Sequence, residues 1–172
     1  MSLRVGILTV SDRGYRGEYE DQSGPLIREI VSEQLGATVE LEAIVPDSLL
    51  VIQGTLVVWC DEVGLDLILT TGGTGFAPRD VTPEATRAVI QRETSGLTEA
   101  MRAASLRVTP HAMLSRAVAG IRGQTLIVNL PGSPKAAREN LEAILPALPH
   151  GIRLLKDTQG ENRQHDPQLR QV

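Results

Sequence analysis

The chain has 172 residues, 41% of them apolar, with a net charge of −4 and an isoelectric point near 5.4. This length suits one domain with a substantial core. The acidic balance and the few aromatics (one Trp, two Tyr, one Phe) argue against a nucleic-acid-binding scaffold, which normally carries a basic face and stacking platforms. A phosphate ligand would therefore depend on backbone amides, a few local basic residues and a metal ion.

Cysteine content and hydropathy indicate the compartment. The single cysteine, Cys60, excludes an internal disulfide and suits a reducing cytosol. Cys60 follows Trp59 on an expected apolar helix, so we expect it to be a buried packing residue. The sequence carries no signal peptide and no apolar run long enough to span a bilayer. We expect a soluble, cytoplasmic protein that binds neither membrane nor nucleic acid.

The first half of the chain alternates short apolar strands with helices. Strands are expected at 3–10, 39–45 and 65–71, with helical periodicity in the two intervals. Gly36 is the expected stop of the first helix. The polar segment 15–23 is expected to be an exposed loop. This βαβαβ order predicts an α/β protein with parallel neighbouring strands and right-handed crossovers.

The second half adds two helices, a hairpin and a final helical segment. The helices are expected at 84–92 and 97–106, and the hairpin strands at 117–121 and 124–130, with the turn at Arg122-Gly123. Ser133 and Pro134 are typical of a helix cap and a first helical residue, and Pro146 is expected to kink or split that helix. From residue 157 the polar sequence without periodicity predicts a frayed or disordered tail.

The most informative stretch is residues 70–83. It contains three glycines within four residues, namely Gly72, Gly73 and Gly75. Glycine permits positive φ and close approach, so successive amides can point at an anion. Thr82-Pro83-Glu84 then indicates a helix start, with the Thr82 hydroxyl as a cap. The spacing matches neither the P-loop nor the dinucleotide fingerprint, so an ordinary turn is the alternative.

Four segments leave the carboxyl ends of predicted strands: residues 11–13, 46–47, 72–80 and 129–133. In an open parallel sheet these ends share one edge, where ligands bind. Asp47 and Asp80 are therefore candidates to hold Mg²⁺, which favours one or two carboxylates with substrate phosphates. The alternatives are an N-cap role for Asp47 and a position beside the Thr82 cap for Asp80. No Ser-His-Asp or Cys-His arrangement is present, which disfavours acyl transfer.

Several of these segments together carry a family resemblance. Residues 71–86, with 9–13, 45–47, 113–116 and 129–134, resemble the molybdopterin adenylyltransferases, the MogA proteins and the gephyrin G domains. The resemblance covers about residues 3–156. It implies a three-layer α/β/α sandwich with a mostly parallel central sheet at 1–156, followed by a tail at 157–172. It also implies a homotrimer, a possible molybdenum insertase partner, and Mg²⁺-dependent joining of ATP and molybdopterin with release of pyrophosphate.

The resemblance also assigns site residues. Asp47 and Asp80 match the two family aspartates required for turnover. Ser105 and Ser115 match pterin contacts, although from the residues alone Ser105 is expected to bond to its own helix and Ser115 to be a turn residue. The resemblance gives the nucleotide and phosphate edge to Gly72, Gly73, Thr74, Gly75, Asn129, Pro131, Gly132 and Ser133. Ser11 and Asp21 match the pocket lining, and Arg79 and Lys135 are candidates for extra phosphate contacts.

The residues leave two other functions open. One is a non-catalytic molybdopterin binder or scaffold, as in MoaB-like proteins whose aspartate motifs are degraded; this chain keeps both motifs. The other is a different enzyme on the same fold, such as the CinA-type nucleotide amidases. The choice between molybdenum and tungsten, the identity of any insertase and the separate roles of the two aspartates stay open.

Overall fold

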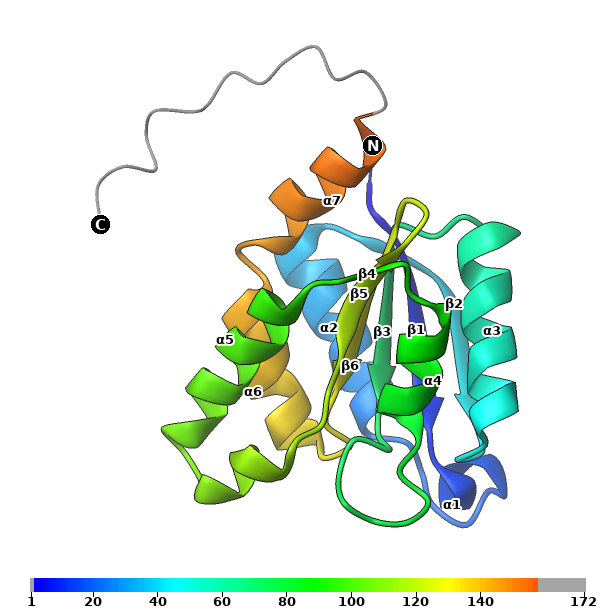
Figure 1. The fold of residues 1–172 in the computed structure, drawn as a ribbon, viewed down its shortest axis with the longest axis vertical. Helices are drawn as coiled ribbons and strands as arrows, with labels where there is room; N and C mark the ends of the chain where they lie inside the picture. Colours follow the sequence, from blue (N-terminus) through cyan, green and yellow to red (C-terminus); the bar gives the residue numbers. More distant parts are fainter. Residues whose placement is uncertain (1, 158–172) are drawn as a thin grey trace.

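A single six-stranded sheet forms the centre of the computed structural model, which describes residues 2–157 (Figure 1). The strands are β1 Arg4–Val10, β2 Thr38–Val45, β3 Leu67–Thr71, β4 Arg92–Glu93, β5 Ala119–Arg122 and β6 Thr125–Leu130. The helices are α1 Asp12–Tyr15, α2 Ser23–Leu35, α3 Leu49–Asp61, α4 Thr82–Val89, α5 Ser95–Leu106, the 3₁₀ helix η1 Pro110–Leu114, α6 Pro134–Ile144 and α7 Leu148–Lys156. Among residues 2–157, none of the helices has the length and apolar character needed to cross a bilayer.

The sheet is mostly parallel, as predicted. Its strand order is β2-β1-β3-β6-β5-β4; β2, β1, β3 and β6 run parallel, and β5 and β4 are antiparallel to their neighbours. The hairpin turn lies one residue later than expected, because Arg122 still pairs with Thr125. Gly123 takes a φ of +57°, which suits the tight turn. The carboxyl ends of four parallel strands therefore share one edge, the lower one in Figure 1.

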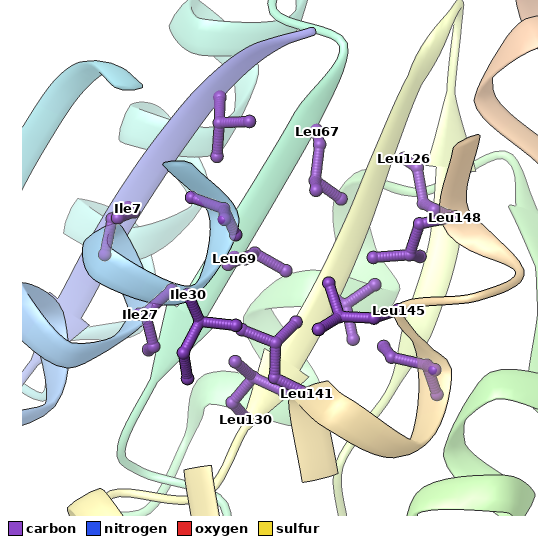
Figure 2. Close-up of a cluster of buried hydrophobic side chains, with 14 of the residues drawn as sticks. Ile7, Ile27, Ile30, Leu67, Leu69, Leu126, Leu130, Leu141, Leu145 and Leu148 are labelled. Carbon is purple, nitrogen blue, oxygen red and sulfur yellow. The ribbon is translucent and has the colours of Figure 1, made fainter. Parts of the chain in front are cut away.

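Helices cover both faces of the sheet, which confirms the three-layer α/β/α sandwich. On one face, α2, α6 and α7 pack on the sheet around a core of aliphatic side chains, with α5 lying on α6 (Figure 2). On the other face, α3 and α4 bury Ile52, Leu56, Trp59, Ala85 and Val89. Cys60 is buried in this second core as expected, and burial raises the pKa of its thiol to about 11.

The largest differences from the sequence expectations are short or terminal elements. The four-residue helix α1, which is too short for periodicity to reveal, precedes the loop expected at 15–23 and includes its first residue, Tyr15. Ser11 Oγ accepts the Gly14 amide at 3.0 Å at the start of this helix. The helix expected at 84–92 ends at Val89, because the chain then turns extended to pair with β5. Gly36 ends α2 with φ +59°, and Pro146 lies between α6 and α7, both as predicted. Apart from Asp157, the expected tail at 157–172 lies outside the described residues.

Candidate active site

The four loops expected to converge do contact one another at the carboxyl edge of the sheet. The Asp12 amide donates to Asp47 Oδ2 at 2.8 Å, and the Asp47 amide donates to Asp12 Oδ1 at 3.0 Å. The Gly72 amide donates to the Leu130 carbonyl at 3.2 Å. Strand topology has therefore brought the ends of β1, β2, β3 and β6 into direct contact.

Two glycines let the loop after β3 pass tightly over the end of β1. Gly72 has φ +99° and Gly73 φ +67°, and a Cβ on Gly72 would clash with the backbone carbonyl oxygen of Val10. The predicted cap is wrong: Thr82 does not cap α4 but donates its hydroxyl hydrogen to the Gly72 carbonyl at 2.9 Å. Tertiary contact has overridden the local preference, because the hydroxyl reaches a buried carbonyl ten residues earlier.

The same loop lies against both candidate carboxylates. A Cβ on Gly73 would lie 3.2 Å from Asp47 Oδ1, and one on Gly75 would lie 2.9 Å from Asp80 Oδ2. The backbone amides of Gly73, Thr74 and Gly75 make no hydrogen bond to any of residues 2–157. Two acids therefore lie beside one short loop that has three adjacent amide donors without partners among these residues. Such an arrangement suits a phosphate group together with a cation.

Asp47 is held by the neighbouring loop and does not cap α3. Ser48 occupies the N-cap position without a side-chain cap bond, so the N-cap alternative for Asp47 is wrong. Burial is the main cause that raises the pKa of Asp47, and the negative charges of Asp12 and Asp80 raise it further. A cation near Asp47 and Asp80 would offset this repulsion.

Asp12 is a site residue that the sequence reasoning did not single out. Arg79 binds its carboxylate with both Nε and Nη2 at 2.8 Å, and this bond lowers the pKa of Asp12. Arg79 was a candidate phosphate contact, but here its guanidinium is engaged by Asp12. The position of Asp12 directly after β1, within one of the converging segments, was the signal that could have identified it.

The loop that carries Asp80 is held by an arginine that the sequence reasoning also missed. Asp80 Oδ2 accepts the Ala77 amide at 3.0 Å, which closes a local turn. Arg116 donates from Nε to the Gly75 carbonyl at 2.8 Å and from Nη2 to the Asp80 carbonyl at 2.7 Å. Its Nη1 pairs with Glu84. Since Thr82 is no cap, the alternative that placed Asp80 beside a cap is wrong as well.

Two cavities open beside residues 72–75, called the glycine loop below. The larger, of about 250 Å³, is lined by Thr74, Gly75, Arg102, Ser105, Thr109, His111, Ala112, Leu114, Ser115, Pro131, Ala136, Glu139 and Asn140. The smaller, of about 120 Å³, is lined by Thr9, Val10, Ser11, Gly14, Tyr19, Asp21, Ser23, Thr71, Gly72 and Gly132. The two serines matched to the pterin thus share one cavity, and the Ser11 and Asp21 candidates share the other.

The serines of the larger cavity differ in how they are held. Ser105 accepts a hydrogen bond from Asn140 Nδ2 on α6 at 2.6 Å, so the expected bond within its own helix is wrong. Asn140 is buried and was not predicted; its place on the inner face of α6 was the available signal. Ser115 is the C-cap of η1, and among residues 2–157 its hydroxyl makes only a long 3.4 Å contact, with the Ala117 amide. The Ser115 hydroxyl is therefore the freer of the two for a ligand.

The other candidates line neither cavity: Gly73, Asp47, Arg79 and Asp80, described above, and Asn129, Ser133 and Lys135. Asn129 is fully buried, and its side chain bonds Val118, Thr70 and Thr86 within the sheet and α4. Ser133 caps α6 as predicted, accepting the Ala136 amide at 3.2 Å. Lys135 is 78% exposed. These contacts hold the loop after β6 in place, and through it Pro131 and Gly132.

The carboxylates at this site fit Mg²⁺, and they do not form a metal site with three or more protein ligands from the described part of the chain. Among residues 2–157, no three His, Cys, Asp or Glu side chains gather as metal ligands. Asp47 and Asp80 would contribute two carboxylates, while Asp12 is neutralised by Arg79. Mg²⁺ commonly takes one or two carboxylates and completes its shell with water and substrate phosphates. The residues therefore fit a cation that arrives with a nucleotide.

Comparison with known proteins identifies the family. Residues 6–150 match the family described as "Probable molybdopterin binding domain". The molybdopterin adenylyltransferase of Helicobacter pylori strain J99 is 48% identical over 155 residues, covering 90% of this chain and 88% of that protein. The crystal structure of the molybdopterin biosynthesis enzyme MoaB from Thermus thermophilus has a TM-score of 0.85 and 57% identity, covering 89% of this chain and 96% of that one.

A third relative matches only in part. Gephyrin of Dictyostelium discoideum is 52% identical over 160 residues, which are 88% of this chain but 22% of gephyrin. The chain belongs to the molybdopterin-binding family, and the family resemblance noted from its motifs is confirmed.

Proposed function

We propose that this protein is a molybdopterin adenylyltransferase of molybdenum cofactor biosynthesis. It transfers AMP from ATP to the terminal phosphate of molybdopterin and releases pyrophosphate. The observation that carries the proposal is the glycine loop, which adjoins both Asp47 and Asp80 between two cavities and whose amides have no partner within residues 2–157. The 48% identity to an enzyme named for this activity supports it. We assign the activity to residues 1–156 and to the cytoplasm, where ATP is available.

The reaction requires the protein mainly to align the molybdopterin phosphate with the α-phosphorus of ATP. A phosphate monoester is mostly dianionic at neutral pH because its second pKa is about 6. It attacks the α-phosphorus of ATP without a general base, and pyrophosphate leaves with the electron pair. The glycine-loop amides align the anions, and Asp47 and Asp80 hold the metal. Mg²⁺, when bound, neutralises the charge that develops on the phosphate oxygens.

In this proposal the two substrates bind at different positions. The larger cavity takes the pterin, since Ser105, Ser115, Asn140 and Glu139 offer both donors and acceptors there. The nucleotide phosphates lie along residues 72–75, beside the smaller cavity. The adenylylated product passes to a molybdenum insertase, the partner that the family resemblance implies.

The direct test is product formation. Purified protein is incubated without oxygen with molybdopterin, ATP and Mg²⁺, and pyrophosphate and adenylylated molybdopterin are measured. The proposal requires both products in equal amounts. Binding of molybdopterin without pyrophosphate release would favour the non-catalytic binder, and no response to molybdopterin would favour an amidase of the CinA type.

Ser115→Ala is expected to weaken molybdopterin binding. Loss of one hydrogen bond costs about 0.5–1.5 kcal/mol, or roughly 2- to 13-fold in Kd, and more if the partner is charged. The Kd of ATP should change little, and both are measured by titration. Thr55→Ala, which removes an exposed hydroxyl bonded within α3, is the control. Equal losses for both ligands would contradict the division of the cavities.

The Mg²⁺ requirement is expected to rise as pH falls. The pKa of Asp47 is raised in the folded state, so a proton competes with Mg²⁺ at a pH where an ordinary carboxylate is ionised. By the same shift, the contribution of Asp47 to stability is present at low pH and is lost as pH rises through its folded pKa. The measurement is the Mg²⁺ concentration for half-maximal turnover against pH. Since the substrate phosphate also titrates, Asp47→Asn is the control; an equally steep pH dependence in that variant would exclude Asp47.

We also propose that the protein forms a homotrimer, as the family resemblance implies. The outer face of α3 is apolar: Leu50 is 75% exposed, and Val51, Gly54 and Val58 lie within the same third of the helix surface. Such a patch on a soluble domain supports self-association. Sedimentation at micromolar concentration is expected to give the mass of a trimer, and Leu50→Asp a smaller species. A monomer throughout that range would contradict the assembly.

A further inference from the structure

Arg116 lies where the two halves of the proposed site meet. The residue before it, Ser115, lines the larger cavity. The Arg116 amide donates to the Thr74 carbonyl at 2.9 Å, and Thr74 and Gly75 line the same cavity. The backbone that would touch the pterin is therefore continuous with the residue whose side chain reaches the Asp80 loop.

The Arg116 side chain spans both ends of that loop. Its guanidinium donates to the carbonyls of Gly75 and Asp80, at 2.8 and 2.7 Å, across the exposed segment 76–79. Glu84 on α4 pairs with the remaining nitrogen and orients the group. A planar guanidinium with donors in a rigid fork fixes the separation of its two acceptors. A lysine ammonium has no such fork and would leave one carbonyl without its donor.

We propose that Arg116 is a positioning residue that couples occupation of the larger cavity to the placement of Asp80. This inference rests on the proposed function. A ligand against Ser115, Thr74 and Gly75 restrains both the backbone of Arg116 and one of its acceptors. The freedom left to Asp80 falls, so less ordering is required when Mg²⁺ and the nucleotide bind. By linkage, the nucleotide with Mg²⁺ must tighten molybdopterin binding by the same factor.

The test is a binding cycle with a second, structural readout. The Kd of molybdopterin is measured alone and with Mg²⁺ and an ATP analogue that has a methylene bridge between the α- and β-phosphates. The wild-type protein should bind about fivefold more tightly, or better, in the second case. Arg116→Lys keeps the charge but should reduce the factor to near one, with the Kd of molybdopterin alone almost unchanged. In parallel, molybdopterin should slow hydrogen exchange of the Ala77 and Asp80 amides in the wild type only.

Arg122→Lys is the matched control. Arg122 lies on β5, the strand that follows Arg116, and likewise donates to a carbonyl, that of Val89 at 2.9 Å, and pairs with a carboxylate, Asp61. Its coupling factor should equal that of the wild type. If Arg116→Lys does not fold, Glu84→Gln removes the orienting carboxylate and should lower the factor in part.

The outcomes separate the inference from the function. Three results would overturn the positioning role of Arg116. They are a coupling factor of one in the wild type, an unchanged coupling factor in Arg116→Lys, and an equal loss of coupling in Arg122→Lys. Molybdopterin binding without product overturns the proposed reaction, while the coupling is still measured in the binding cycle. Product formation by the wild type with no coupling overturns the inference alone.

Discussion

Replacing Asp47 or Asp80 by Asn is expected to lower adenylyl transfer by about 10²–10³-fold, the usual scale for removing one strong electrostatic contact with the transition state. Asn keeps the size of the side chain and an acceptor oxygen, so it can still accept the Asp12 amide at position 47 and the Ala77 amide at position 80. What it removes is one negative charge facing the metal. Residual activity should therefore need more Mg²⁺, while molybdopterin binding in the larger cavity persists.

Turnover and thermal midpoint are to be measured on the same samples. The control is Asp61→Asn at the far end of α3, whose half-exposed ion pair with Arg122 is worth at most about 1 kcal/mol. It should leave turnover unchanged. If Asp47→Asn and Asp80→Asn kept normal turnover and lost only stability, the two carboxylates would be structural and the metal assignment would fail.

Gly72→Ala is expected to be among the most destabilising single-methyl changes in the chain. The residue has φ +99°, and the added Cβ would meet the Val10 carbonyl oxygen, which belongs to the backbone of β1 and cannot rotate away. Left-handed strain of about 1–2 kcal/mol adds to overpacking of about 1–3 kcal/mol. The expected loss is roughly 2–5 kcal/mol of unfolding free energy.

Gly36→Ala separates these two contributions. Gly36 also has positive φ, +59°, but no atom of the described part of the chain lies within 4 Å of its added Cβ. Its loss should be the backbone strain alone, about 1–2 kcal/mol. Urea denaturation of both variants gives the two free energies. If the losses are equal, contact with Val10 contributes nothing, and the close passage of the loop over β1 is not what requires glycine at position 72.

The sequence by itself determined the order of the elements and the edge at which ligands would bind. Short apolar runs separated by helical periodicity imply parallel strands, and parallel strands place their carboxyl ends together. Asp47 could be selected because it lies two residues after the end of β2, and Asp80 because it lies between the three glycines and the start of α4. The glycines marked where backbone must approach another group. These inferences need only neighbours in sequence and the general geometry of α/β sheets.

The partners of individual polar groups were decided only by the tertiary structure. Arg79 and Asp12 are 67 positions apart, Ser105 and Asn140 are 35 apart, and Arg116 reaches Gly75 across 41. Thr82 shows the reason most clearly, since a hydroxyl with a good local use as a cap bonds instead to the Gly72 carbonyl. A buried polar group must find a partner, and where local and distant partners compete, packing of the whole chain decides which one is in reach.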